Sequence, residues 1–289
     1  MMPFHPSYDV AGERRAYTFH GGPVGCLILH GFMGSPTSSR PMAAFLAERG
    51  VTVHCPLLPG HGELPDKLCS ISRGAWLAEA EEAMAYLSEQ CDEIFLVGHS
   101  MGTVLAAHLA SHNPDVRGLI MLAPLYQVPS RAIHLLRVLR YVMPWFYPWR
   151  VKQLRRLTRE RILDLYPDLD LDDPEVQAWL PQATRVPTDA IDEMRKIADY
   201  GRLLWPQLTL PVLILQGEQD IAVKPGNTER ISELLPAEDK VLHQFARAGH
   251  ELMRPFEPVH KKVWPLVHTF IEQRATHELA PAVPMAAAP

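Results

Sequence analysis

The chain has 289 residues, of which 47% are hydrophobic and 21% are charged, and its formal net charge is −5 at pH 7. These values are ordinary for a globular protein with a sizeable core, and the mild acidity argues against a nucleic-acid binder. No run approaches the ~18 apolar residues of a membrane-spanning helix, and the first residues lack the pattern of a secretory signal, so we expect a cytoplasmic protein without a transmembrane segment.

Short apolar runs alternate with helical segments along most of the chain. Segments that begin as buried strands lie at residues 23–32, 51–62, 93–100, 116–124, 210–220 and 239–250. Helical patterns lie at residues 35–50, 72–90, 225–235 and 258–274. Ser72 is placed to cap the second of these helices. Strands that alternate with helices pair in parallel through crossover connections, so the sequence predicts an α/β fold, a mostly parallel sheet with helices on both faces.

One block breaks this alternation. Residues 126–186 contain no apolar strand pattern; a basic and aromatic helical sequence is followed by the acidic segment PDLDLDDPEV. We interpret this block as an inserted helical cap, which leaves residues 1–125 and 187–275 as the core. The Ala/Pro-rich residues 276–289 are expected to form a disordered tail.

The segment Gly98-His99-Ser100-Met101-Gly102 joins a predicted strand to a predicted helix and has the pattern G-x-S-x-G. In a nucleophile elbow, a sharp turn at this junction lifts the serine hydroxyl clear of the sheet, and the two glycines avoid collisions beside the strained serine. An ordinary glycine-rich turn is the alternative interpretation. The flanking strand and helix favour Ser100 as a nucleophile.

A serine hydroxyl attacks only when a base removes its proton, and an acidic residue usually orients that base. On this type of sheet the expected order is serine, acid, histidine. Asp220 and His250 follow successive strands in that order, at the edge where open α/β sheets place their sites. Glu218 is an alternative acid, and Asp220 as a plain turn residue is another interpretation.

The chain has 14 histidines, so position matters more than presence. His99 precedes the serine in a strand and should point away from it. His243 lies inside a strand, whereas His260 and His268 belong to the last helix. His250 lies in a loop at the strand-end side, and we therefore favour it as the base.

A negative charge forms on the substrate oxygen when a serine attacks a carbonyl carbon. The backbone N–H of Met101, directly after the serine, and that of Phe32, after the strand that ends at His30-Gly31, are placed to stabilise this oxyanion. For the segment around Phe32, an ordinary glycine turn is the alternative.

These residues together resemble the α/β-hydrolase superfamily, and within it the bacterial carboxylesterases and monoacylglycerol lipases with a small cap. The resemblance covers Gly25 to Gln273 and includes GHSMG, LHGFMGSP, CPLLPGHG, LAPLY, LQGEQDIAV and AGHEL. It implies hydrolysis of small acyl esters, with an apolar acyl group, through an acyl-enzyme intermediate and without a metal or organic cofactor. It also implies that Ser100, Asp220 and His250 form the catalytic triad, with Phe32 and Met101 as the oxyanion donors.

Other functions remain open on the sequence. A thioesterase or acyltransferase would keep the same triad, and peptidase activity on small amides is compatible with it. Four arginines of the cap could meet a phosphate-bearing acyl carrier or form a solvated face: Arg150, Arg155, Arg156 and Arg159. The aromatic segment MPWFYPWR could serve peripheral lipid contact or partner binding, or could pack as the core of the cap. Acyl length, the alcohol part and the oligomeric state are not determined by the sequence.

Overall fold

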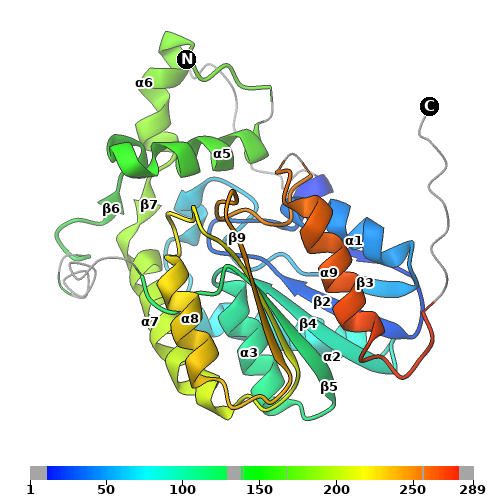
Figure 1. Ribbon diagram of the computed structural model, residues 1–289. Helices are drawn as coiled ribbons and strands as arrows, with labels where there is room; N and C mark the ends of the chain where they lie inside the picture. Colours follow the sequence, from blue (N-terminus) through cyan, green and yellow to red (C-terminus); the bar gives the residue numbers. More distant parts are fainter. Residues whose placement is uncertain (1–11, 129–137, 139, 167, 256, 280–289) are drawn as a thin grey trace, which may run out of the picture.

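The structure, a computed structural model, describes residues 12–128, 138, 140–166, 168–255 and 257–279 (Figure 1). A seven-stranded sheet forms its centre, with the strand order β1-β3-β2-β4-β5-β8-β9. Its strands are β1 (Tyr17–Phe19), β2 (Val24–Leu29), β3 (Val51–Cys55), β4 (Glu93–His99), β5 (Val116–Leu122), β8 (Val212–Gly217) and β9 (Lys240–Phe245). β1 pairs antiparallel with β3, and the other pairings are parallel. The predicted α/β class with a mostly parallel sheet is confirmed.

Burial on both faces explains why the central strands are continuous apolar runs. Every residue of β2, β4 and β8 is buried. Helices α1 (Arg40–Ala47) and α9 (His260–Glu272) cover one face of the sheet (Figure 1). The other face is covered by α2 (Arg73–Ser88), α3 (Gly102–His112), α7 (Thr188–Leu204) and α8 (Pro225–Leu234). The sheet therefore separates two apolar cores.

The helix predicted after Ser72 begins as expected. The Ser72 hydroxyl accepts a hydrogen bond from the Ala75 backbone N–H at 3.3 Å, as an N-cap residue does. Short 3₁₀ turns lie at η1 (Gly12–Arg14), η2 (Pro36–Ser38), η3 (Pro65–Leu68), η5 (Pro148–Arg150), η6 (Lys152–Leu154) and η7 (Trp205–Gln207).

Between β5 and α7 the chain leaves the core, and the helices α5 (Arg155–Leu165) and α6 (Pro174–Ala183) lie above one edge of the sheet, in green in Figure 1. A two-residue antiparallel pair, β6 (Trp145–Phe146) with β7 (Val186–Pro187), brings the segment before α5 next to the segment after α6. The sequence did not indicate these strands, because two residues are too short to show an alternating pattern. The boundaries of the predicted cap, residues 126–186, stay a prediction.

The segment after α9 is attached to the start of β4. The buried Glu93 carboxylate accepts hydrogen bonds from the Thr276 backbone N–H at 2.9 Å and from the His277 backbone N–H at 3.1 Å. The Thr276 hydroxyl also donates to it, and His277 Nδ1 lies 2.6 Å away. The first residues of the segment expected to be disordered are thus held on the core, and residues 280–289 lie outside the described residues. No helix in the described part of the chain is long and apolar enough to cross a membrane.

Candidate active site

Ser100 lies at the junction of β4 and α3 in a backbone conformation that residues other than glycine rarely adopt. Its φ angle is 54°, in the left-handed region. The Ser100 N–H donates to the Leu122 carbonyl of the neighbouring strand at 2.9 Å, and the Ser100 carbonyl accepts from the N–H of Thr103 at 3.1 Å and from its hydroxyl at 2.6 Å. These bonds hold the strained turn in place.

The glycines on either side of Ser100 are required by close backbone packing. A Cβ atom at Gly98 would lie 2.4 Å from the Thr103 Cα, and one at Gly102 would lie 2.0 Å from the Leu29 carbonyl oxygen. Neither neighbour is a side chain that could rotate away. The geometry is that of the nucleophile elbow that the G-x-S-x-G pattern indicated.

Asp220 and His250 are brought together from the loops that follow β8 and β9. Their Oδ2 and Nδ1 atoms are 2.8 Å apart, and both side chains are buried. The other carboxylate oxygen of Asp220 accepts the backbone N–H groups of Ala222 and Val223, each at 2.8 Å. Because the carboxylate accepts the bond, His250 Nδ1 carries the proton, and its Nε2 is left with a free lone pair.

Opposing effects set the charge of Asp220. Burial raises the pKa of Asp220. The hydrogen bond and charge of His250 and the amides of Val223 and Ala222 lower the pKa by more than burial raises it, so it lies below its ordinary value. The carboxylate is therefore ionised at neutral pH. It favours the Nδ1–H tautomer of the imidazole and can stabilise an imidazolium.

The competing residues lie elsewhere. The side chain of Glu218 is exposed, whereas that of Asp220 is buried against the imidazole. His243 is half-buried on β9, and His260 Nδ1 lies 2.7 Å from the Glu257 carbonyl in the last helix. His268 is also on α9.

The segment that follows β2 forms a tight turn beside Ser100. The Gly34 N–H donates to the Gly31 carbonyl at 2.9 Å, and Met33, the third residue of the turn, has a φ of 61°. A Cβ atom at Gly31 would lie 3.1 Å from the Ser100 Cβ, so the turn packs closely against Ser100. Among the described hydrogen bonds, the Phe32 N–H is not used by any backbone carbonyl.

Met101 is fully buried as the residue before the first turn of α3. Its N–H, like that of Phe32, donates to no backbone carbonyl within the ranges that the structure covers. These two amides therefore belong to the residue that follows Ser100 and to the turn that packs against it. Met101 also lies at the N-terminus of α3, which favours negative charge.

The hydrogen bond between the Ser100 hydroxyl and the His250 imidazole is not formed among the described residues of this structure. The two elements are connected instead through His99, whose Nε2 lies 3.0 Å from the His250 carbonyl oxygen. Catalytic hydrogen bonds are often long or poorly aligned before a substrate binds.

Two residues to which the sequence analysis gave no role support this arrangement. Gln216 is fully buried at the end of β8; its amide donates to Asp220 Oδ2 at 3.2 Å, and its carbonyl accepts the Thr228 hydroxyl at 2.7 Å. A polar residue that ends an otherwise apolar strand was the available signal. His99 was expected to point away from the nucleophile, and no pattern indicated its contact with the His250 loop.

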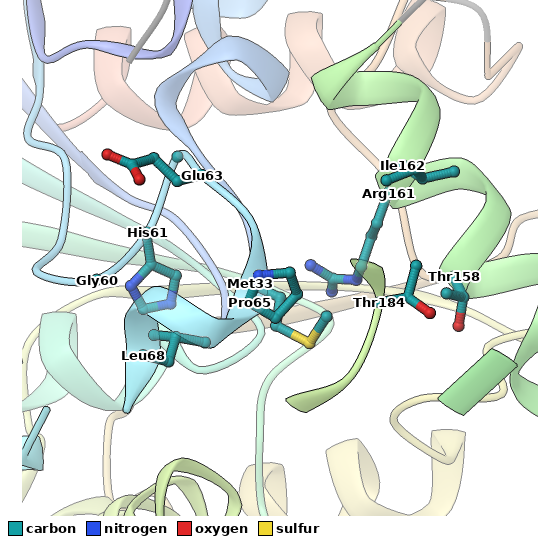
Figure 2. A pocket seen from close by; sticks show the side chains of 11 residues that line it. Met33, Gly60, His61, Glu63, Pro65, Leu68, Thr158, Arg161, Ile162 and Thr184 are labelled. Carbon is teal, nitrogen blue, oxygen red and sulfur yellow. The ribbon is translucent and has the colours of Figure 1, made fainter. Parts of the chain in front are cut away.

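A small cavity lies between the core and the cap, next to the turn that carries Phe32 (Figure 2). Its volume is about 20 Å³, room for about one water molecule. Core residues in its wall include Met33, His61 and Glu63. Thr158 and Arg161 of α5 line the opposite side, and the Arg161 side chain reaches from the helix toward Met33 (Figure 2). Among the described residues, no cluster of three or more His, Cys, Asp or Glu side chains could hold a metal ion.

The parallel sheet, the elbow and the Asp–His pair on successive strand ends define the α/β-hydrolase class. Residues 25–258 match the sequence family Hydrolase_4, described as serine aminopeptidase, S33. The chain belongs to this family.

Two relatives cover most of the chain. A thermostable monoacylglycerol lipase of Bacillus sp. (strain H-257) is 28% identical over 246 residues, which cover 84% of this chain and 89% of the relative. A carboxylesterase of Bacillus subtilis (strain 168) is 25% identical over 254 residues, covering 86% and 94%. The chain is accordingly a serine ester hydrolase of the α/β-hydrolase type.

Solved structures share the fold. A structure from a study of the metagenome-derived lipolytic enzymes LipS and LipT superimposes with a TM-score of 0.74 at 24% identity, covering 92% of this chain and 100% of the other. The monoacylglycerol lipase of Paleococcus ferrophilus gives a TM-score of 0.69 at 20% identity, covering 90% and 98%.

Proposed function

We propose that the chain is a carboxylesterase of the monoacylglycerol lipase type, with Ser100 as nucleophile, His250 as general base and Asp220 as its orienting acid. The 2.8 Å contact between the buried Asp220 carboxylate and His250 Nδ1 carries this proposal. Because this contact occupies Nδ1, the Nε2 atom of His250 is left as the proton acceptor. The His250 carbonyl is in turn contacted by His99, the residue before Ser100. The named relatives, a monoacylglycerol lipase and a carboxylesterase, support the ester substrate.

The reaction proceeds in two halves. In the first, His250 Nε2 takes the Ser100 proton while Oγ bonds to the ester carbonyl carbon, and the negative charge collects on the carbonyl oxygen. The bond to the alcohol oxygen then breaks, and the alcohol leaves with the proton from His250. In the second half, His250 takes a proton from water, the resulting oxygen bonds to the acyl carbon, and Ser100 leaves with the proton as the acid is released.

The Phe32 and Met101 amides bind the oxyanion in both halves. Their backbone N–H groups are fixed by the turn and by the start of α3, so they need no rearrangement as charge develops. A single donor of this kind typically contributes 10²–10³-fold to turnover.

The cap would hold the alcohol part of the substrate. The cavity between α5 and the core has polar residues on both walls, with His61 on the side of the core and Arg161 on the side of α5 (Figure 2). These groups suit an alcohol that carries further hydroxyls, as glycerol does. A space of about 20 Å³ is too small for such a group, so side chains of the wall or α5 itself must shift when the substrate enters.

Replacement of Ser100 by alanine tests the proposal. Hydrolysis of monoacylglycerols and of p-nitrophenyl esters should fall by several orders of magnitude at an unchanged thermal midpoint. Ser70 is a matched control, because it is an exposed serine that also has a positive φ, 64°. Ser70→Ala should keep wild-type activity. Ester hydrolysis that survives Ser100→Ala would contradict the assignment, and a preference for acyl-CoA over the oxygen ester would favour a thioesterase.

A second role is favoured by the surface of the cap. Val138, Tyr141, Val142 and Met143 are large apolar residues of one segment, and each is more than half exposed. Exposed apolar residues beside arginines suit peripheral contact with a lipid surface. Flotation of the Ser100→Ala protein with vesicles, and its loss in Tyr141→Ser/Met143→Ser, would support this role; equal flotation of both proteins would contradict it.

A further inference from the structure

The imidazole of His99 occupies a place between the elements that carry the site. His99 is the last residue of β4, directly before Ser100, and it is buried. Its Nε2 atom lies 3.0 Å from the His250 carbonyl oxygen, and the centroids of the two rings are 4.8 Å apart. On its other side, a Cβ atom at Gly31 would lie 3.4 Å from His99 Nδ1. One ring therefore contacts the nucleophile strand, the oxyanion turn and the loop of the general base.

The chemistry of this contact fixes the protonation of the ring. A carbonyl oxygen can only accept, so His99 Nε2 carries a proton and donates it. Burial lowers the pKa of His99 to about 4; the charges of His250 and Arg161 also lower it, whereas the charge of Glu251 and the hydrogen bond to the His250 carbonyl raise it. His99 is thus a neutral donor at the pH at which an ester hydrolase of this type works.

His250 needs a second anchor beside Asp220. The bond from Nδ1 to Asp220 fixes one atom of the ring, and the loop backbone is bonded two residues earlier, where the Ala248 carbonyl accepts the Gln219 N–H at 2.9 Å. The loop continues into Glu251, whose buried carboxylate pairs with Arg254 at 3.3 Å, three residues further along the same segment. His99 instead reaches the loop from the central sheet and contacts the backbone carbonyl of His250 itself.

We propose that His99 is a positioning residue that holds the His250 backbone, and with it the imidazole, in register with the Ser100 hydroxyl. The proposal rests on the triad proposed above. The absence of a formed Ser100–His250 hydrogen bond among the described residues makes this register important, because the ring must align when substrate binds. A displacement of ~1 Å in such a geometry lowers turnover about 100-fold.

Three substitutions at His99 distinguish the effect of losing the hydrogen bond from the effect of emptying the space that the ring fills. The amide nitrogen of His99→Gln is as many bonds from Cα as the imidazole Nε2, so it can still donate to the His250 carbonyl. The amide of His99→Asn reaches only the position of Nδ1, and His99→Phe fills the space without a donor. His20→Asn, at an exposed histidine, is the control.

The variants are assayed on one p-nitrophenyl ester, at a temperature below the thermal midpoint of every variant, so that each is folded. We expect kcat to fall about 10- to 100-fold in His99→Asn and His99→Phe, with KM within about threefold of wild type. The rate at which a fluorophosphonate labels Ser100 should fall in parallel. His99→Gln should recover kcat to within about threefold. The proposal is overturned if Asn and Phe keep wild-type kcat, or if Gln loses as much as they do.

Ser100→Ala in the same assay distinguishes this proposal from the one on which it rests. If activity survives Ser100→Ala, the proposed catalytic triad is wrong. If Ser100→Ala is inactive but the His99 variants all keep wild-type kcat, only the positioning role of His99 is wrong.

Discussion

Replacement of Gly102 by alanine should reduce both the stability and the turnover of the enzyme. The added Cβ would lie 2.0 Å from the Leu29 carbonyl oxygen, 2.6 Å from its carbon and 2.8 Å from the His30 carbonyl oxygen. All three are backbone atoms of the β2 end, so no side chain can rotate away. An ordinary contact begins at 3.4 Å, and the elbow and β2 must therefore separate by roughly 1.4 Å.

The size of the effect follows from that displacement. Overpacking against fixed backbone typically costs about 1–3 kcal/mol, which for a chain of this size lowers the thermal midpoint by roughly 2–5 °C. A shift of ~1 Å between the nucleophile and the oxyanion turn should lower kcat about 100-fold.

Gly226 provides the matched control, because a Cβ there meets nothing within 4 Å in the first turn of α8. Gly226→Ala should keep activity and gain up to about 1 kcal/mol. Urea unfolding and ester hydrolysis are measured for both variants. If Gly102→Ala matches Gly226→Ala in midpoint and kcat, the argument that close backbone packing fixes the elbow is refuted.

Three further predictions concern charge. Asp220→Asn should lower kcat about 10⁴-fold, because an amide favours the wrong tautomer of His250; kcat within tenfold of wild type would contradict this role. Burial raises the pKa of Glu93, but hydrogen bonds from the C-terminal segment bring it to about 2, below the ordinary 4.5, so its stabilisation is complete above pH 4.5 and is lost as the pH falls toward 2. Glu93→Gln should therefore lose stability at pH 7 and show a smaller decline in acid, which urea midpoints at pH 7, 4 and 3 would reveal; parallel wild-type and variant curves would be inconsistent with it. Arg161→Ala should lower the kcat/KM for a monoacylglycerol about tenfold relative to the ethyl ester of the same acid, whereas Arg159→Ala, exposed on the same helix, should leave the ratio within twofold; equal ratios in both variants would exclude Arg161 from alcohol recognition.

The core of the fold was predictable because its signals are local. Continuous apolar runs mark strands that are buried on both faces, and the positions of Asp220 and His250 at strand ends follow from chain order alone. The same holds for Ser100, because the glycine pattern around it lies within five consecutive residues.

What the sequence did not indicate depends on contacts between distant segments. β1 has three residues and is defined by its pairing with β3, and the Glu93 carboxylate meets a segment more than 180 positions away. The orientation of His99 is of the same kind. Strand alternation places a side chain on one face, but the carbonyl that His99 contacts belongs to a loop 151 residues later.

The contact between Gly102 and the end of β2 also bears on how the substrate range could be changed. Because backbone meets backbone there, the turn that carries Ser100 and the end of β2 form one unit that tolerates no insertion of volume. Libraries for new ester preferences should leave this unit untouched and randomise the inner side of α5, where Thr158, Arg161 and Ile162 present replaceable side chains.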